Sequence, residues 1–215
     1  MNKTDYSKIA ALFDLDGVVL DTESQYTDFW EKIGVEFLKK TGFGSLIKGQ
    51  TLNNIFETYF PNKDFHKKIT EGLNNFELNM SLPYIPGAKD FIQGIKKHGI
   101  KVALVTSSNQ NKMQSVYKKL PDFASMFDKI LTAEMFARWE LAPDCYLLGA
   151  KLFNLEVEKC VVFEDSFHGL QAGFSAGMKV IGLTTTNPKE KIQHLTHMVI
   201  KDFTNLDITL IDQVL

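Results

Sequence analysis

The sequence predicts an α/β protein with a doubly wound parallel sheet and a small helical cap domain inserted after its first strand. Short apolar runs rich in valine and isoleucine recur along the chain, as expected of strands that are buried on both faces. Segments with helical periodicity lie between most of these runs, and strands that alternate with helices pair in parallel. One long stretch near the N-terminus has helical periodicity alone, which predicts the cap.

Six apolar runs are predicted strands, and the core they form is expected to be Rossmann-like. The runs are Ile9–Phe13, Val102–Val105, Ile130–Leu131, Val161–Phe163, Val180–Leu183 and Met198–Ile200. Four predicted helices lie in this part of the chain, namely Ala88–His98, Asn109–Leu120, Pro143–Phe153 and Gly169–Ala176. Gly99 follows the first of these helices, in the position where glycine commonly ends a helix.

The stretch from Thr22 to about Tyr84 contains no convincing strand run. Its apolar residues recur at a spacing of about 3.6 residues, which is the period of an amphipathic helix. The prolines of Pro83–Gly87 restrict the backbone and make a natural linker back to the core. We therefore expect residues 1–21 and 86–215 to form the core domain and residues 22–85 to form the cap.

Composition excludes several classes of function. The 215 residues carry a net charge of -2 and no block of basic residues, so no nucleic-acid partner is expected. The N-terminal apolar run is too short for a signal peptide or a membrane span, and we expect a cytoplasmic protein without a membrane partner. Cys145 and Cys160 form no CxxC pair, which argues against a disulfide framework or a zinc site. A monomer is the default expectation.

The first candidate motif is Asp14-Leu15-Asp16-Gly17, directly after the first predicted strand. It places two carboxylates at the carboxyl edge of a parallel sheet, where such folds bind ligands. Gly17 would let the chain turn sharply away from the strand. Aspartate and glycine are also common turn residues, so this motif alone leaves a purely structural role open.

The second candidate motif is Thr106-Ser107-Ser108-Asn109, after the strand at Val102–Val105. Thr106 could donate its hydroxyl to a phosphate, and the free backbone amides at a helix start favour an anion. Ser107 and Ser108 are candidate phosphate-binding residues for the same reason. The alternative interpretation is an ordinary serine or asparagine helix cap.

The third candidate motif is Glu164-Asp165-Ser166, at the end of another predicted buried strand. Adjacent buried carboxylates repel each other and lose solvation unless a cation lies beside them. Asp14, Asp16 and Asp165 at neighbouring strand ends would form an oxygen-rich site suited to Mg²⁺.

These three motifs, in this order and with the helical cap after the first, resemble the haloacid dehalogenase (HAD) superfamily. The residues from Phe13 to Thr22 and from Phe163 to Gly173 are similar to its β-phosphoglucomutase-like subgroup. The resemblance implies that Asp14 attacks phosphorus and forms an aspartyl phosphate, with Asp16 as acid and base.

The same resemblance implies a metal site and a phosphate site. Mg²⁺ would be held by the Asp14 carboxylate, the Asp16 backbone carbonyl and Asp165, with Glu164 acting directly or through water. Thr106 and the Ser107 amide would orient the phosphoryl group. His168 is expected in a turn beside the third motif and not as a metal ligand.

One motif departs from the family pattern. Where the family has Gly-Lys-Pro-x-Pro-Asp, this chain has a stretch with Glu140 at the lysine position. The family lysine neutralises the nucleophile and the phosphoryl oxygens, so an acid there reverses the charge. Arg138 could supply the missing cation, Lys151 could reach the site from the following helix, or the protein could be a weak catalyst.

The cap departs from the mutase pattern as well. Tyr26 and Leu52 stand where mutases of the subgroup have histidine and arginine, and a mutase needs cap cations to hold a distal phosphate. Thr22, Lys48 and Gln50 are the remaining candidate substrate-binding residues, although a solvated surface lysine is the plainer interpretation of Lys48.

The sequence therefore predicts a Mg²⁺-dependent phosphatase of a small phosphorylated metabolite, with a sugar phosphate as the expected substrate. The mobile cap would close over the site and exclude water. Two alternatives stay open: a phosphomutase of the β-phosphoglucomutase type, and a weakened HAD-fold protein that binds a phosphorylated ligand.

Overall fold

The computed structural model describes residues 4–136 and 143–215, and its centre is a six-stranded parallel sheet. The strand order is β3-β2-β1-β4-β5-β6, and each neighbouring pair is parallel. The strands are β1 (Ala10–Phe13), β2 (Lys101–Val105), β3 (Lys129–Leu131), β4 (Cys160–Glu164), β5 (Lys179–Leu183) and β6 (Met198–Ile200). All six predicted strands are confirmed, with ends that shift by one residue at most.

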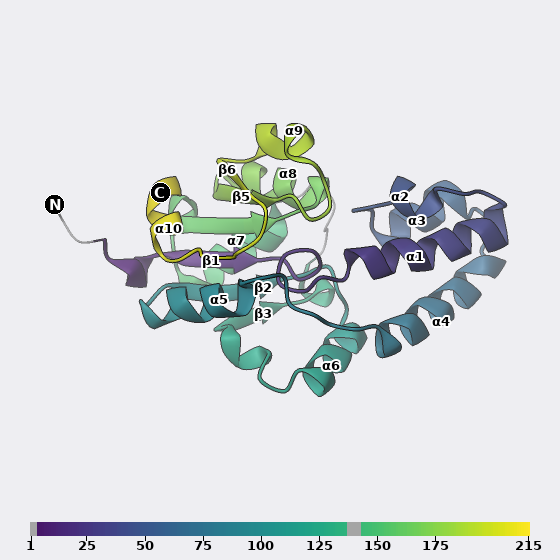
Figure 1. The fold of residues 1–215 in the computed structure, drawn as a ribbon, viewed down its shortest axis with the longest axis horizontal. Helices are drawn as coiled ribbons and strands as arrows, with labels where there is room; N and C mark the ends of the chain where they lie inside the picture. The colour runs from purple at the N-terminus through teal and green to yellow at the C-terminus, as the bar shows by residue number, and fades with distance from the viewer. Residues whose placement is uncertain (1–3, 137–142) are drawn as a thin grey trace.

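Helices cover both faces of this sheet (Figure 1). Helices α7 (Asp144–Phe153) and α8 (Phe167–Ser175) pack on one face, where Ala10 and Leu12 point. Helices α5 (Ala88–Lys97), α6 (Gln110–Lys119) and α10 (Thr209–Val214) pack on the other face, where their apolar residues share a core with Phe13. The short helix α9 (Lys189–Ile192) lies near β5 and β6. The predicted doubly wound α/β core is confirmed.

Local capping explains where these helices begin. The Asn109 side chain accepts a hydrogen bond from the Lys112 amide at the start of α6, and Ser166 accepts one from the Gly169 amide at the start of α8. Such side chains satisfy amides that have no partner inside the helix. Helix α8 therefore begins at Phe167, two residues before the predicted start, and His168 lies in its first turn and not in a loop.

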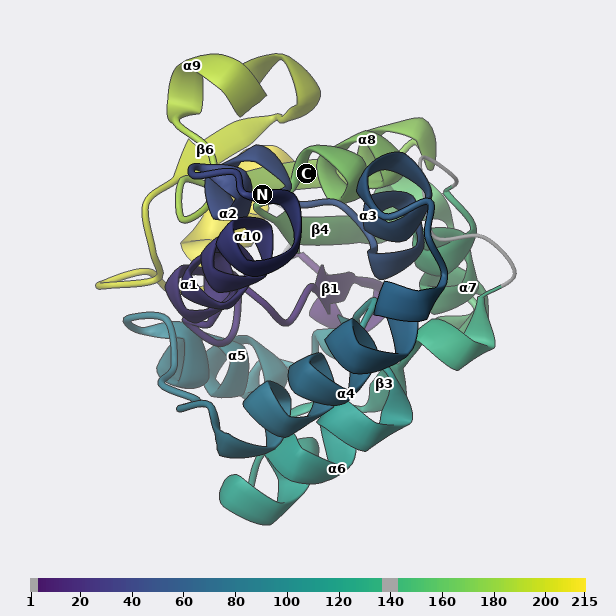
Figure 2. The same ribbon diagram turned by 90° about the vertical axis from the view of Figure 1, so that its right-hand side faces the viewer.

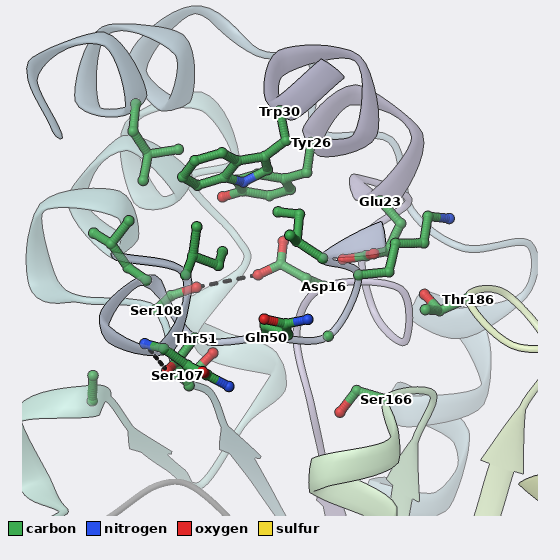
Figure 3. A pocket seen from close by; sticks show the side chains of 18 of the residues that line it. Asp16, Glu23, Tyr26, Trp30, Gln50, Thr51, Ser107, Ser108, Ser166 and Thr186 are labelled. Carbon is green, nitrogen blue, oxygen red and sulfur yellow. Dashed lines mark hydrogen bonds between the residues drawn. The ribbon is translucent and has the colours of Figure 1, made fainter. Parts of the chain in front are cut away.

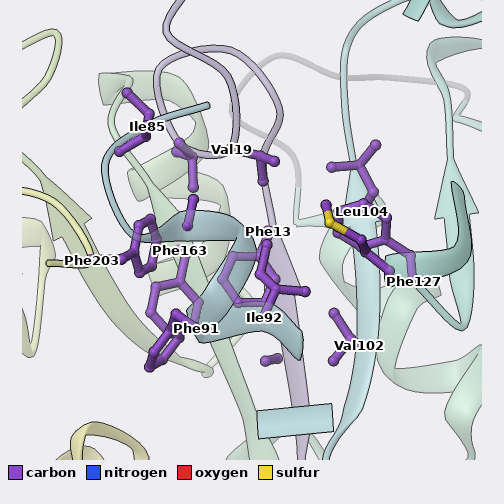
Figure 4. Close-up of a cluster of buried hydrophobic side chains, with 14 of the residues drawn as sticks. Phe13, Val19, Ile85, Phe91, Ile92, Val102, Leu104, Phe127, Phe163 and Phe203 are labelled. Carbon is purple, nitrogen blue, oxygen red and sulfur yellow. The ribbon is translucent and has the colours of Figure 1, made fainter. Parts of the chain in front are cut away.

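A cluster of aromatic rings fixes the two central strands against each other (Figure 4). Phe13 and Phe163 are register partners on β1 and β4, and their rings stack with centroids 4.4 Å apart. Phe91 and Phe203 pack against this pair. The residue that follows each stacked phenylalanine is therefore held at a defined place on the carboxyl edge of the sheet.

The inserted segment is helical, as predicted, and lies beyond the carboxyl edge of the sheet (Figures 1 and 2). It contains α1 (Glu23–Ile33), a π-helical turn (Gly34–Leu38), α2 (Phe43–Leu46), α3 (Leu52–Tyr59) and α4 (Asp64–Asn79). These helices share a separate apolar core that includes Trp30, Phe43, Phe60 and Ile69.

Two adjacent chain segments join this cap to the sheet. The Asp21 amide donates to the Pro83 carbonyl at 2.8 Å, and the Ile85 amide donates to the Val19 carbonyl at 3.0 Å.

In the part of the chain that the structure describes, no helix is both long and apolar enough to cross a membrane. Cys145 and Cys160 are free and buried.

Candidate active site at the carboxyl edge of the sheet

Three buried carboxylates meet where β1 and β4 end. The Phe13–Phe163 register places Asp14 beside Glu164, and the Asp14 amide donates to the Phe163 carbonyl at 3.1 Å. One carboxylate oxygen from each of Asp14, Glu164 and Asp165 lies within 4.8 Å of the others. Asp14 and Asp165 therefore lie together with Glu164, whereas the Asp16 carboxylate, which we also expected at this site, is not in this group among the described residues.

Charge repulsion at this cluster is strong. Burial raises the pKa of the Asp14 carboxyl well above its ordinary value, and the neighbouring Glu164 and Asp165 raise it further. Burial also raises the pKa of Asp165 well above its usual range, with Glu164 and Glu23 adding to the effect. Buried carboxylates that cannot all ionise at low cost indicate a place for a divalent cation.

Glu164 is the most firmly held member of the cluster. One of its oxygens accepts hydrogen bonds from the Asp165 amide at 2.8 Å and from the Ser166 amide at 2.9 Å. The other oxygen accepts from the Tyr146 hydroxyl at 3.2 Å. A Cβ atom at Gly169 would lie 1.7 Å from this carboxylate, so helix α8 can approach it only with glycine there.

Asp165 is oriented by the loop after β5 and by the turn after β1. Its Oδ2 atom accepts from the hydroxyls of Thr185 and Thr186, and its main-chain carbonyl accepts from the Asn187 amide group. Gly17 has a φ of +78°, and a Cβ atom there would lie 2.0 Å from Asp165 Oδ2. The predicted sharp turn at Gly17 therefore also makes room for the carboxylate.

Asp16 lies in different surroundings, among hydrogen-bond donors (Figure 3). Its Oδ1 atom accepts from the Thr22 hydroxyl, and its Oδ2 atom accepts from the Ser108 hydroxyl at 3.2 Å. The Lys112 ammonium forms an ion pair with the same Oδ2 atom. Asp16 thus has a fixed orientation and a cationic partner, neither of which its sequence neighbours revealed.

The phosphate-binding motif lies on the neighbouring strand end, after β2. Ser107 and Ser108 line the cavity above the site. Thr106 is fully buried, its amide donates to the Leu131 carbonyl, and its Oγ1 atom accepts from the Ser108 amide at 3.0 Å. Thr106 is not among the lining residues, and its contact with a phosphoryl group stays a prediction.

A cavity of about 830 Å³ lies between the sheet edge and the cap. Asp14, Asp16, Glu164 and Asp165 line it from the core. The cap contributes the aromatic rings of Tyr26 and Trp30 and the polar side chains of Lys48, Gln50, Thr51, Asn53 and Asn54. Figure 3 shows Tyr26, Trp30 and Gln50 around the same space as Asp16.

The remaining predicted residues have varied outcomes. Lys48 and Gln50 line the cavity as expected, whereas Thr22 is fully buried, is not a lining residue and bonds to Asp16 instead. Lys151 is exposed on α7 and is not a lining residue. Arg138 and Glu140 lie outside the described residues.

Contacts between cap and core surround the cavity. His168 Nδ1 lies 2.7 Å from the Gly49 carbonyl, which joins α8 to the loop after α2. Tyr26 donates its hydroxyl to Glu77 at 2.8 Å inside the cap. The cap is therefore in contact with the core on the side of α8, directly beside the candidate site.

Lys112 is the main site residue that the sequence reasoning missed. On a helix with Lys118 and Lys119 in its last turn, another lysine is most simply interpreted as solvated. The available signal was its position in the first turn of the helix that follows Thr106–Asn109, because that helix begins at the carboxyl edge of the sheet. Glu23 and Glu77 were missed as well, although both line the cavity.

The fold and this acidic edge define a capped α/β protein with a candidate metal-binding site at the carboxyl edge of its parallel sheet. A family model described as "Hydrolase: haloacid dehalogenase-like hydrolase" matches residues 10–177. The chain therefore belongs to the haloacid dehalogenase-like hydrolases, and the resemblance inferred from its motifs is confirmed.

The chain is also similar in sequence to known proteins. Over 187 residues the chain is 27% identical to "Phosphorylated carbohydrates phosphatase" of Thermotoga maritima, covering 80% of this chain and 83% of that protein. It is 28% identical over 210 residues to "Protein SUPPRESSOR OF QUENCHING 1, chloroplastic" of Arabidopsis thaliana, covering 92% of this chain but 20% of that protein. This chain therefore spans about a fifth of the length of that plant relative.

The fold also matches a solved structure. A HAD hydrolase of family IA, variant 3, from Entamoeba histolytica HM-1:IMSS superimposes with a TM-score of 0.82 at 22% identity. The match covers 96% of this chain and 98% of that chain. At this level of identity the likeness concerns the fold.

Proposed function

We propose that this protein is a Mg²⁺-dependent phosphatase that hydrolyses a small organic phosphate through an aspartyl phosphate on Asp14. The observation that carries the proposal is the arrangement of two kinds of carboxylate in one cavity. Asp14 lies in a buried acidic cluster that a cation would complete, and Asp16 lies on the same cavity wall among donors. The residues 1–21 and 86–215 would act as the core and residues 22–85 as the cap.

The donor set of the cluster fits Mg²⁺. All three side chains offer carboxylate oxygens, which Mg²⁺ prefers as ligands. Asp14 and Asp165 would hold the ion, with Glu164 as a direct or water-mediated support and the Asp16 main-chain carbonyl as a further predicted ligand. When bound there, Mg²⁺ would lower the repulsion between the Asp14 carboxylate and the substrate phosphate.

In the first step, an Asp14 carboxylate oxygen forms a bond to phosphorus while the bond from phosphorus to the substrate oxygen breaks. Protonated Asp16 gives its proton to that leaving oxygen, which departs as an alcohol. Ser107 and Ser108 line the cavity beside Asp16 and would orient the phosphoryl group.

In the second step, ionised Asp16 takes a proton from a water molecule as the water oxygen bonds to phosphorus. The bond from phosphorus to Asp14 breaks, which restores the Asp14 carboxylate and releases inorganic phosphate. One residue can serve as acid and then as base because the first step leaves it without its proton. A mobile cap that closes over the site would exclude water from the first step.

The lining of the cavity supports a sugar phosphate as the substrate. Gln50, Asn53 and Asn54 offer amide groups that can bind hydroxyls, and Tyr26 and Trp30 offer apolar ring faces. Among the described residues, Lys48 is the only basic side chain that the cap contributes to the lining. One exposed lysine suits a monophosphate better than a bisphosphate, since a second phosphate needs its own cations. The relative that acts on phosphorylated carbohydrates supports the same class.

The test is phosphate release from a panel of sugar, sugar-alcohol and nucleotide monophosphates, with and without Mg²⁺. We expect release that requires Mg²⁺ and that Asp14→Asn abolishes. Asp21→Asn is the matched control, because Asp21 is an exposed aspartate outside the cavity lining, and it should retain full activity.

Other outcomes would identify the alternatives. Isomerisation of β-glucose 1-phosphate without net phosphate release would indicate a phosphomutase. Binding of phosphorylated sugars without any turnover would indicate a ligand-binding protein. The cytoplasmic location and the monomeric state remain predictions from the sequence.

A further inference from the structure

Lys112 is an unusual residue for the start of a surface helix. Only 4% of it is exposed, although the other lysines of α6 lie at the end of the helix, away from the cavity. Lysine is almost never fully buried unless it is paired. Its partner here is the carboxylate of Asp16, which lies 96 residues earlier in the chain.

Stability alone does not explain this ion pair, in which the Lys112 side chain is 4% and the Asp16 side chain 19% exposed. Removing two charges from water costs several kcal/mol per ion, and replacing such a pair by apolar residues is often neutral or stabilising. An apolar surface already lies beside Lys112, because the Tyr26 ring of the cap is close to its Nζ atom. A methionine would therefore satisfy packing at position 112, and the ammonium has to be explained by what it contacts.

The contacts of Lys112 converge on Asp16. Its Nζ atom and the Ser108 hydroxyl both donate to Asp16 Oδ2, while the Thr22 hydroxyl donates to Oδ1. Ser108 directly precedes the N-cap residue Asn109 and Lys112 lies in the first turn of α6, so the start of one helix supplies both donors. A carboxylate with donors on both oxygens cannot rotate freely, and its orientation toward the cavity is fixed.

Lys112 also touches the cap. Its Nζ atom lies 4.7 Å from the centre of the Tyr26 ring, on α1, within the range of a cation–π contact. The Ser115 hydroxyl and the Lys119 ammonium of α6 donate to the main-chain carbonyls of Glu77 and Met80 at the end of α4. Helix α6 thus joins Asp16 to the helices of the cap.

We propose that Lys112 is a positioning residue for proton transfer, which holds the Asp16 carboxylate toward the substrate while Tyr26 of the cap covers the ammonium. This inference rests on the proposed phosphatase function and adds a residue to its site. It also identifies a cation inside the described part of the cavity, where the sequence had pointed to Arg138 or Lys151. Because Lys112 acts by fixing the orientation of the Asp16 carboxylate, replacing Lys112 should slow turnover without weakening substrate binding.

The experiment compares Lys112→Met, Lys112→Arg and Lys119→Met in steady-state assays with a good substrate of the wild-type enzyme. A displaced acid/base group commonly costs on the order of 10–100-fold in rate. We expect Lys112→Met to lower kcat by this factor with KM within about threefold, since positioning is what is lost. Lys112→Arg should recover part of the loss, because its guanidinium can also donate to a carboxylate.

Lys119→Met is the matched control, because Lys119 is on the same helix and also contacts the end of α4. It should keep kcat near the wild-type value. An equal loss in Lys112→Met and Lys119→Met would assign the effect to cap docking and overturn the proposal. Thermal unfolding of each variant establishes that it is folded; if Lys112→Met is not, Lys112→Gln takes its place.

A double-mutant cycle decides whether Lys112 acts through Asp16. With p-nitrophenyl phosphate, whose leaving group needs little protonation, the residual rates of Asp16→Asn and Asp16→Asn/Lys112→Met should be equal. Additive losses would show that Lys112 acts independently and would overturn the inference. Failure of the phosphatase function is distinguishable, since the wild-type protein would then release no phosphate from any substrate.

Discussion

The two halves of the site handle negative charge in opposite ways. On one side Asp14, Glu164 and Asp165 lie together, and burial, with the repulsion of neighbouring carboxylates added to it, raises the pKa of Asp14 and of Asp165. On the other side Asp16 accepts from two hydroxyls and pairs with the Lys112 ammonium. The first group suits an external cation, whereas the second already has one from the protein.

This difference follows from the work proposed for each carboxylate. A nucleophile that attacks an anionic phosphate needs a cation that also contacts the phosphate, which a metal ion can do. An acid/base group needs a fixed direction and a reversible proton, which hydrogen-bond donors can provide without occupying the substrate position. The four predictions below test whether the two halves are as distinct as their surroundings indicate, and they run from the largest effect to the smallest.

Substitutions in the two halves of the site should differ in how strongly the loss of activity depends on the leaving group of the substrate. Asp16→Asn is expected to slow hydrolysis of a sugar phosphate by on the order of 10²–10⁴, the usual contribution of general acid–base catalysis. The loss should be much smaller with p-nitrophenyl phosphate, whose leaving group departs as a stable anion. Asp165→Asn should slow both substrates by similar factors, and the measurement is kcat/KM for each pair. If Asp16→Asn and Asp165→Asn showed the same ratio between the losses in kcat/KM on the two substrates, the two halves would not have the distinct roles proposed for them.

Packing at the acidic cluster should be less tolerant than packing at the periphery. A Cβ atom at Gly169 would lie 1.7 Å from Glu164 Oε1, so Gly169→Ala should lower the free energy of unfolding by about 1–3 kcal/mol. Gly94→Ala is the matched control, because Gly94 lies inside α5 and a Cβ atom there meets nothing within 4 Å. The control should be stabilised by up to about 1 kcal/mol. Urea denaturation measures both, and a neutral Gly169→Ala would contradict the close approach.

Mg²⁺ should stabilise the protein, and more so at higher pH. The raised pKa values of Asp14 and Asp165 mean that the folded metal-free protein binds more protons than the unfolded chain, so its stability falls as pH rises above their ordinary value of 3.8. Protons and Mg²⁺ compete for the same oxygens, so the metal's effect grows as the protons leave. Saturating Mg²⁺ at a hundred times its Kd contributes about 2.7 kcal/mol.

The measurement is the shift of the unfolding temperature by Mg²⁺ at pH 5 and pH 8, against NaCl of equal ionic strength. Asp165→Asn should remove most of the shift, whereas Lys112→Met should preserve it, since Lys112 belongs to the Asp16 side. A shift that is larger at pH 5 would contradict the proposed competition.

The smallest effect concerns the thiols. Burial raises the pKa of Cys145 to about 12, and the Glu164 and Asp14 carboxylates add to it. Burial likewise raises the pKa of Cys160 to about 12, with Glu158 as the charged neighbour. Because the thiolate is the reactive form, both should resist iodoacetamide at pH 8 until the protein unfolds. Mass spectrometry of the native and the urea-unfolded protein would detect the difference, and rapid native labelling would contradict it.

Much of the fold could be predicted from the sequence because the signals are local. An uninterrupted apolar run such as Val161–Phe163 indicates a strand buried on both faces wherever it lies in the sheet. Boundaries were less predictable, as at α8, because the Ser166 side chain caps the helix two residues before the expected start. Whether such a serine caps the start of a helix or lies in the preceding loop depends on backbone geometry, which composition does not encode.

The sequence by itself placed Asp14, Asp16, Glu164 and Asp165 at one edge of the sheet, because they lie where two predicted parallel strands end. The tertiary structure alone decided what surrounds Asp16. Thr22 donates a hydrogen bond to Asp16 and does not line the cavity as a substrate contact. Lys112, 96 residues later in the sequence, forms the ion pair with Asp16. The physical reason is that periodicity reports how a residue faces its own element, whereas an ion pair between distant elements depends on how those elements pack.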